Sequence, residues 1–296
     1  MTRALLALAC LALSSAPAAV QAFTVRDMLD REVTLPAAPR RIISLVPSIT
    51  EIVFALGGEA RLVGRTDFCD FPAAARSKPS VGGMVAPSLE TIVTLKPDLV
   101  IATMEGNRRP TFDQLTRLGI PVYLVQAHRL VEMRSAVTRM GALTGRQEAV
   151  GPLLARLDAR IDAVARAIAP FPRPRVLYVL WPEPLIVPGA EALVTELIEL
   201  AGGQSITAGD GEAYPRYSLE AAVARAPEVI LLADHGAGRG PHTGAAYEKW
   251  RRLRSLPAVQ TGRLQSVDGT LVHRYGPRVV EGLERLARAI HPEAFR

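Results

Sequence analysis

Aromatic and sulfur-containing side chains fall in segments that are predicted to be loops at the carboxyl ends of strands. In parallel α/β sheets, ligands bind beyond those strand ends. Flat apolar groups with a few polar ones favour a large, partly apolar ligand, held by burial and hydrogen bonds without covalent change. We therefore predict six ligand-binding residues: Phe68, Met84, Trp181, Tyr214, His273 and Tyr275.

The histidines and cysteines lack the spacing of a metal site. No H-E-x-x-H pattern occurs among the five histidines, and no pair of cysteines has zinc-ligand spacing. His235 and His273 fall in predicted cleft-side loops, where either could instead contact a metal carried by a bound ligand. We predict no metal site and no resident cofactor.

Catalytic motifs are also missing from the sequence. The glycine-rich segment 236–240 follows a predicted strand but lacks G-x-G-x-x-G spacing, and Pro241 disfavours a helix directly after it. We interpret this segment as a mobile rim of a cleft. No G-x-S-x-G motif is present. A binding protein is therefore favoured, with an α/β enzyme that uses the same cleft as the alternative.

Two stretches of the sequence repeat one another. Segments 88–101 and 218–231 both begin Ser-Leu-Glu, and both reach a proline followed by an acidic residue at the same interval. This pattern predicts a helix followed by a strand in each case, and hence two lobes of one design.

Acidic residues open several predicted helices. Glu90 and Glu220 lie in the first turn of the two repeated helices, where the helix dipole favours an exposed carboxylate by about 0.3–1 kcal/mol. Their matching placement predicts a second role, docking into arginine pockets of a two-fold symmetric partner. Ser48 and Glu51 are interpreted as a capping box that only initiates a helix.

Short apolar runs alternate with amphipathic stretches from Arg40 onward, as in βαβ units. The predicted fold is α/β, with two Rossmann-like lobes joined by one long backbone helix. The predicted strands are 41–46, 61–66, 98–103, 121–126, 175–181, 228–233 and 262–267. The other predicted helices are 48–56, 111–118, 191–201, 218–226, 245–253 and 278–290.

The long helix is predicted over 146–169, because Leu153, Leu157 and Ile161 belong to one apolar stripe. At 1.5 Å per residue it would be roughly 36 Å long. The proline-rich segment 170–174 ends it. We divide the chain into a signal peptide (1–22), an N-terminal lobe (23–145), a linking helix (146–170) and a C-terminal lobe (171–296).

The amino terminus has the pattern of a cleavable secretory signal. A basic residue precedes an apolar run over 4–13, and small residues end at Ala22. The run is shorter than the ~20 residues that span a bilayer, so export to the periplasm is predicted. After cleavage Cys69 is the one cysteine left, and we predict that it is a buried small hydrophobe.

The net charge of +6 comes from scattered arginines that often lie near Asp or Glu. A nucleic-acid-binding protein would more often show a basic stripe with interleaved aromatic residues, so that class of function is disfavoured.

Characteristic motifs occur in segments 41–51, 67–72, 81–83, 88–90, 96–100, 118–122, 201–203, 217–220 and 276–278. In these segments the chain resembles the periplasmic cobalamin-binding proteins of ABC importers, within the wider siderophore, haem and cobalamin receptor family with a helical backbone. The resemblance covers nearly the whole mature chain and implies two lobes bridged by one long helix, with little closure on binding.

The resemblance also implies roles for single residues. Glu90 and Glu220 match two glutamates that dock onto arginines of the membrane subunits, and Phe68 matches a cleft aromatic of the cobalamin branch. Tyr214 stands where that branch can carry tryptophan, while Met84 and Thr103 stand where it can carry aromatic residues.

Two departures from the family pattern are visible. The iron-ligating tyrosine of haem binders would fall near Gly83 and is absent, which weakens the haem alternative. Asp30 replaces the usual glycine before an arginine.

We predict a monomeric periplasmic substrate-binding protein of an ABC importer that carries cobalamin or a related corrinoid. A ferric siderophore or haem is the alternative ligand. A signalling or adaptor protein that docks a membrane receptor is the alternative from another class.

Overall fold

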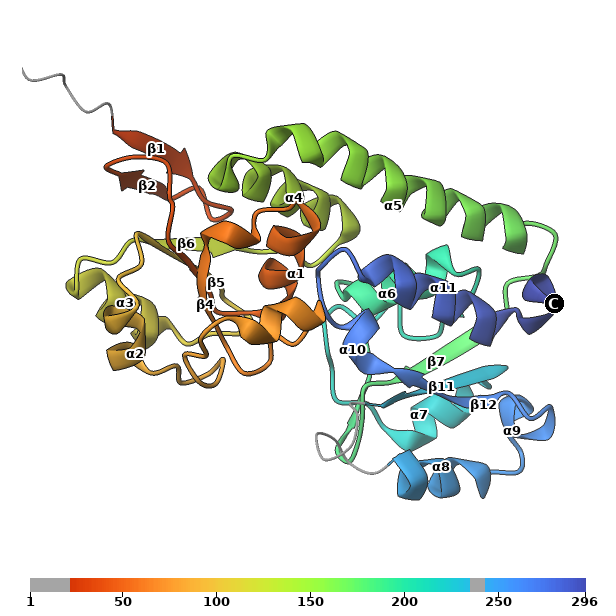
Figure 1. Ribbon diagram of the computed structural model, residues 1–296. Helices are drawn as coiled ribbons and strands as arrows, with labels where there is room; N and C mark the ends of the chain where they lie inside the picture. The colour runs from red at the N-terminus through yellow and green to blue at the C-terminus, as the bar shows by residue number, and fades with distance from the viewer. Residues whose placement is uncertain (1–21, 235–242) are drawn as a thin grey trace, which may run out of the picture.

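The computed structural model describes residues 22–234 and 243–296, which form two α/β lobes (Figure 1). The predicted signal peptide, His235 and the glycine-rich segment 236–240 lie outside the described residues, except for Ala22. In the N-terminal lobe the parallel sheet has the order β4-β3-β5-β6. Its strands are β3 (Ile42–Ser44), β4 (Leu62–Arg65), β5 (Leu99–Thr103) and β6 (Val122–Val125).

The C-terminal lobe has a second parallel sheet of order β10-β7-β11-β12. Its strands are β7 (Arg175–Val179), β10 (Gln204–Ser205), β11 (Val229–Asp234) and β12 (Leu264–Asp268). In both sheets the strands therefore lie in the order second, first, third, fourth along the chain. This shared topology agrees with the repeat predicted from the sequence.

The helices follow the predicted alternation, with three additions: α4 (Leu130–Thr144) and the short helices α9 (Pro257–Gln260) and α10 (Gly269–Val272). Helix α4 packs against α5 (Gln147–Ile168), the predicted long helix. The others are α1 (Pro47–Ala55), α2 (Leu89–Thr94), α3 (Arg109–Arg117), α6 (Leu193–Leu200), α7 (Leu219–Ala224), α8 (Thr243–Arg251) and α11 (Val279–Ile290), with 3₁₀ turns η1 (Glu59–Arg61), η2 (Ala73–Ser77) and η3 (Pro292–Phe295). None of the helices in the described ranges is long and apolar enough to cross a membrane.

Strands β5, β7 and β11 are buried on both faces of their sheets, which explains why they are nearly continuous apolar runs. In β5, Leu99 and Ile101 belong to one core cluster, while Val100 and Ala102 belong to another on the opposite face. The first of these clusters extends through α5 into the C-terminal lobe. The two lobes therefore share part of one hydrophobic core.

Helix α5 lies along both lobes (Figure 1). Its buried side chains recur at intervals of four and seven residues, at Leu153, Leu157, Val164 and Ile168, and therefore lie on one face of the helix. It packs on α4 of the first lobe and on α11 of the second. The Arg160 guanidinium also binds both carboxylate oxygens of Glu284 on α11, at 2.7 and 2.8 Å. These contacts on both sides make α5 a continuous support for the two lobes.

The repeated α2–β5 and α7–β11 units match in detail. Ser88 and Ser218 cap their helices by accepting hydrogen bonds from backbone N–H groups, at 3.2 and 3.0 Å. Lys96 and Ala226, before the matching prolines, both have positive φ, +47° and +44°. Both units therefore end their helix in the left-handed conformation that is uncommon for such residues.

Two short antiparallel pairs differ from the prediction. The predicted strand 175–181 divides, because β7 ends at Val179 and β8 (Trp181–Pro182) pairs with β9 (Leu185–Ile186) instead. At the amino terminus β1 (Phe23–Arg26) pairs with β2 (Glu32–Leu35), and neither strand was predicted. Asp30 in the connecting turn has φ +59°, the backbone region that glycine adopts most readily.

Candidate functional site

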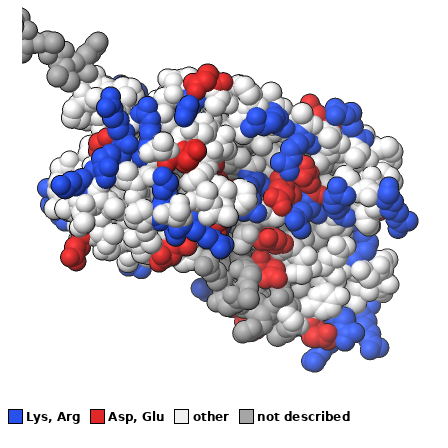
Figure 2. Space-filling model, in the orientation of Figure 1, with Lys and Arg blue, Asp and Glu red and all other residues white. Residues whose placement is uncertain are grey.

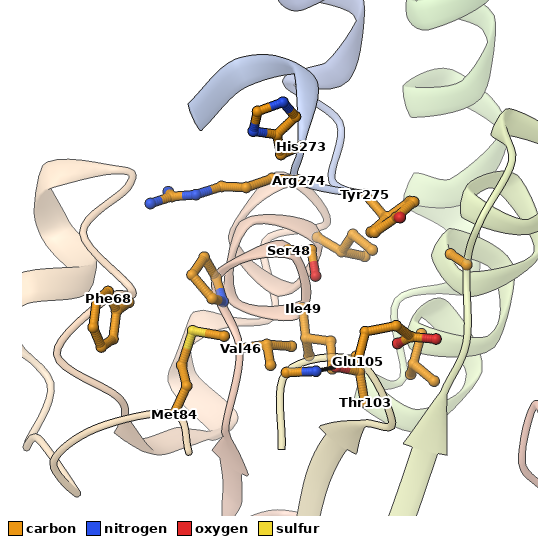
Figure 3. Close-up of a pocket in the computed structure, with 15 residues that line it drawn as sticks. Val46, Ser48, Ile49, Phe68, Met84, Thr103, Glu105, His273, Arg274 and Tyr275 are labelled. Atoms are coloured by element: carbon orange, nitrogen blue, oxygen red, sulfur yellow. Dashed lines mark hydrogen bonds between the residues drawn. The ribbon is translucent and has the colours of Figure 1, made fainter. Parts of the chain in front are cut away.

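A cavity of about 310 Å³ lies where the two lobes meet (Figure 3). In the N-terminal lobe its walls come from the segments that follow β3, β4, β5 and β6. The C-terminal lobe contributes the segment between α10 and α11. A ligand here would lie beyond the carboxyl ends of the parallel strands, as the sheet topology predicts.

Four of the six predicted ligand-binding residues line this cavity: Phe68, Met84, His273 and Tyr275. Figure 3 shows Phe68 and Met84 on one side and His273 and Tyr275 above. Between them the floor is apolar, formed by Val46, Pro47, Ile49 and Ile52. The surface combines apolar burial with a few polar groups, which suits a partly apolar ligand.

Trp181 and Tyr214 do not line this cavity. Trp181 is the first residue of β8. Its indole N–H donates a hydrogen bond to the backbone carbonyl of Glu183, two residues on, at 3.1 Å. Tyr214 lies just outside, 36% exposed, and is hydrogen-bonded through its side chain to Tyr275. Burial raises the pKa of the Tyr214 hydroxyl, and burial together with the neighbouring Tyr214 raises that of Tyr275. Both hydroxyls therefore stay neutral hydrogen-bonding groups.

Histidines near the cavity are held by polar neighbours. His273 Nε2 lies 2.9 Å from the hydroxyl of buried Tyr178. His128 Nε2 lies 3.2 Å from Glu105 Oε1 and 2.8 Å from Gln126 Nε2, and its ring meets Tyr275 edge-on with centroids 6.2 Å apart. Within residues 22–234 and 243–296, no three His, Cys, Asp or Glu side chains are grouped to hold a metal ion.

The interpretation of Ser48 and Glu51 as a capping box is wrong. Helix α1 begins at Pro47 with Val46 as its N-cap, and the cap has no side-chain hydrogen bond. Ser48 instead lines the cavity, and Glu51 is buried, only 3% exposed. The Glu51 carboxylate meets Arg274 of the other lobe at 3.4 Å. The acidic residue thus joins the lobes rather than starting the helix.

Arg274 is shared between two carboxylates of the N-terminal lobe. Its Nη1 lies 3.1 Å from Asp70 Oδ1 as well as 3.4 Å from Glu51 Oε1, and Arg278 approaches Glu51 at 3.9 Å. Partial burial favours the neutral form of Asp70, but the hydrogen bond and charge of Arg274 outweigh it and lower its pKa. Burial dominates at Glu51 and raises its pKa to about 7. Ionised Glu51 is therefore costly despite its two arginine neighbours.

Glu90 and Glu220 are exposed in the first turns of α2 and α7, the equivalent helices of the two lobes. Figure 1 shows both helices on the side of their lobes that faces away from α5. Both side chains are thus open to solvent.

The burial of Cys69 confirms the prediction of a buried thiol; its Sγ lies 3.2 Å from the hydroxyl of Thr66.

Three charged groups at the lobe junction were not among the predicted ligand-binding residues: Glu51, Glu105 and Arg274. Glu105 and Arg274 lie in loops that were predicted to follow strands, so their position was available from the sequence. The ion pairs of Arg274 could not be predicted from the sequence, because Arg274 is 223 positions from Glu51 and 204 from Asp70.

Comparison with known proteins identifies the family. The model of the family described as "Periplasmic binding protein" matches residues 42–270. The chain belongs to this family. Periplasmic binding proteins capture solutes for transporters, so the prediction of a binding protein is confirmed and the enzyme alternative is wrong. Membership also gives the chain an extracytoplasmic location.

Several members of the periplasmic binding protein family are similar over most of their length. An uncharacterised ABC transporter substrate-binding lipoprotein of Bacillus subtilis (strain 168) is 28% identical over 281 residues, covering 92% of this chain and 87% of that one. The crystal structure of the periplasmic vitamin B12 binding protein of Vibrio cholerae is 27% identical, with a TM-score of 0.72, covering 88% and 99%. A periplasmic haem binding protein from Pseudomonas aeruginosa is 30% identical, with a TM-score of 0.73, covering 86% and 93%. These likenesses confirm the predicted helical-backbone fold.

Proposed function

We propose that this periplasmic binding protein carries cobalamin or a related corrinoid to the membrane subunits of an ABC importer. The observation that carries the proposal is the cavity between the lobes, where Phe68 and Met84 face an apolar floor and Tyr275 adds a polar edge. The likeness to a vitamin B12 binding protein supports the same ligand. Apolar burial of one macrocycle face and hydrogen bonds to its rim would supply the affinity, with the ligand unchanged and no resident cofactor.

Titration calorimetry with cyanocobalamin tests this proposal. We expect saturable binding to one site and a raised unfolding temperature in the presence of the ligand. A protein that gives neither heat nor a thermal shift with cyanocobalamin does not carry this ligand.

Haem is the second candidate. The likeness to a haem binding protein and the position of His273 and Tyr275 in the cavity favour it. A haem-loaded protein would be coloured after expression, and its absorption spectrum would differ from that of a corrinoid complex. A colourless protein that binds cyanocobalamin excludes haem as the resident ligand.

Delivery in this proposal uses Glu90 and Glu220. Both are exposed, and they occupy equivalent positions on the two lobes, which suits a partner built from two similar subunits. We further infer that residues 1–22 are removed on export as a signal peptide, and that the mature protein acts as a monomer with lobes 23–145 and 171–296 on either side of the helix 146–170.

A further inference from the structure

Two charged side chains, Glu105 and Arg274, line the cavity, and they lie on different sides of it (Figure 3). The charges of these two groups favour some substituents at the edge of a bound macrocycle and disfavour others. A macrocycle such as haem carries carboxylates at its edge, whereas a corrinoid such as cobalamin carries neutral amides.

The positive charge of Arg274 is already balanced within the protein. Its guanidinium meets Asp70 at 3.1 Å and Glu51 at 3.4 Å, and its side chain is only 17% exposed. Among the cavity-lining residues in the described part of the chain, Arg274 is the only Lys or Arg. Above about pH 7, where Glu51 is ionised as well as Asp70, a ligand carboxylate would therefore have to compete with two protein carboxylates for this one cation.

Glu105 presents its carboxylate beside Tyr275, whose pKa it helps to raise after the larger effects of burial and of Tyr214. The Glu105 side chain is 33% exposed and meets His128 at 3.2 Å. An ionised carboxylate only accepts hydrogen bonds, so it suits the N–H groups of an amide and repels another carboxylate. In water, two like charges about 4 Å apart repel by an amount worth about fivefold in affinity, and by more near a protein surface.

We propose that Glu105 selects a macrocycle whose rim carries neutral amides over one whose rim carries carboxylates. This specificity rests on the proposed function, because it assigns Glu105 a role toward the same ligand in the same cavity. It follows because an ionised Glu105 carboxylate can only accept hydrogen bonds, and because the Arg274 guanidinium already pairs with Asp70 and Glu51.

The test uses two ligands with the same ring and metal, dicyanocobinamide with amide side chains and dicyanocobyrinic acid with carboxylates in their place. Affinities are measured by calorimetry at pH 8 and low salt for the wild type, Glu105→Gln and the control Glu59→Gln, which removes an exposed charge outside the cavity. We expect the wild type to prefer cobinamide and Glu105→Gln to reduce that preference by about fivefold or more. The control should retain it. Added salt should also reduce the wild-type preference, because it screens exposed charges.

An unchanged preference in Glu105→Gln, with corrinoid binding intact and unfolding temperatures equal, would overturn the role of Glu105 alone. A wild-type protein that binds neither corrinoid would instead overturn the proposed ligand, and with it this specificity. A preference that the Glu59→Gln control loses equally would overturn the assignment to Glu105, because net charge would then account for it.

Discussion

Glu51 carries a carboxyl group that is almost completely removed from water at the junction of the lobes. Its Oε2 has no hydrogen-bond partner within residues 22–234 and 243–296, and Gly276 of the other lobe packs so closely that an added Cβ would lie 2.9 Å from it. Burial raises the pKa of Glu51 to about 7, because Arg274 and Arg278 offset only part of the lost hydration.

This raised pKa predicts how stability depends on pH. The folded protein holds the Glu51 proton up to about pH 7, whereas the unfolded chain releases it near the ordinary value of 4.5. The stabilisation is therefore complete below pH 4.5 and is lost as the pH rises to about 7, a change of about 3 kcal/mol. Urea unfolding of the wild type and Glu51→Gln from pH 4.5 to 8 measures it. The difference between their free energies of unfolding should shift in favour of the variant as pH rises; a constant difference would contradict the raised pKa.

Phe68 is expected to provide part of the ligand affinity. Phe68→Ala should weaken cyanocobalamin binding by about tenfold, because an aromatic contact with the ligand face is lost. Phe71→Ala is the matched control, since Phe71 does not line the cavity. Calorimetry of both variants gives the comparison. Equal losses would mean that Phe68 acts only through the shape of its loop.

For single residues, the sequence predicted the chemical type of a side chain and its position at a strand end better than its contacts in the folded protein. Phe68, Met84, His273 and Tyr275 line the cavity as expected, because strand ends and residue types are local information. Trp181 does not line the cavity, because the predicted strand already ends at Val179 and the chain reverses within a short antiparallel pair. The role of Glu51 depends on Arg274, which only the assembled lobes bring near.

Among the elements, the close contact between α4 and α5 depends on Gly141. A Cβ at this position would lie 2.3 Å from Val150 Cγ2, and Val is stiff at χ1. Gly141→Ala should therefore lower the free energy of unfolding by about 1–3 kcal/mol, less the small gain in helix propensity. Denaturant unfolding measures the change.

Two further variants separate crowding from helix propensity at this contact. Ser135→Ala alters an exposed position on the same helix and should change stability by less than about 0.5 kcal/mol. Val150→Ala removes the obstructing methyl groups, so in its background the cost of Gly141→Ala should largely vanish. An undiminished cost would show that Val150 is not the obstacle.

The elements that the sequence predicted are those with strong local patterns. Strands such as β5 were recognised because both faces are buried, and α5 because of its long apolar stripe. Helix α4 was overlooked although Leu130, Met133, Val137 and Met140 follow the same periodicity. The hairpin β1–β2 has alternating burial but only four residues in each strand, too short a pattern to stand out.

For the whole molecule, α5 limits how far the lobes can move. It packs on both lobes, and one core cluster passes from one lobe to the other. We expect the radius of gyration from small-angle X-ray scattering to change by less than about 1 Å when cyanocobalamin binds. A decrease of several ångströms would contradict a stiff connection.

Docking is the second prediction at this scale. Glu90→Ala combined with Glu220→Ala should leave cyanocobalamin affinity intact and raise, by about tenfold or more, the concentration that half-stimulates the transporter ATPase. Glu59→Ala combined with Glu191→Ala removes one exposed acid from each lobe elsewhere and is the matched control. Normal stimulation by the variant that lacks Glu90 and Glu220 would contradict the docking role.

The control is needed because acidic side chains lie among basic ones on both lobes, as Figure 2 shows.

The walls of the cavity are divided unequally between the halves of the chain. Among the residues that the structure describes, all those lining the cavity except His273, Arg274 and Tyr275 belong to the N-terminal lobe. Any separation of the lobes would withdraw that short segment and leave the solute seated on the first half, open on one side. Release would then begin on the side of the solute that this segment covers.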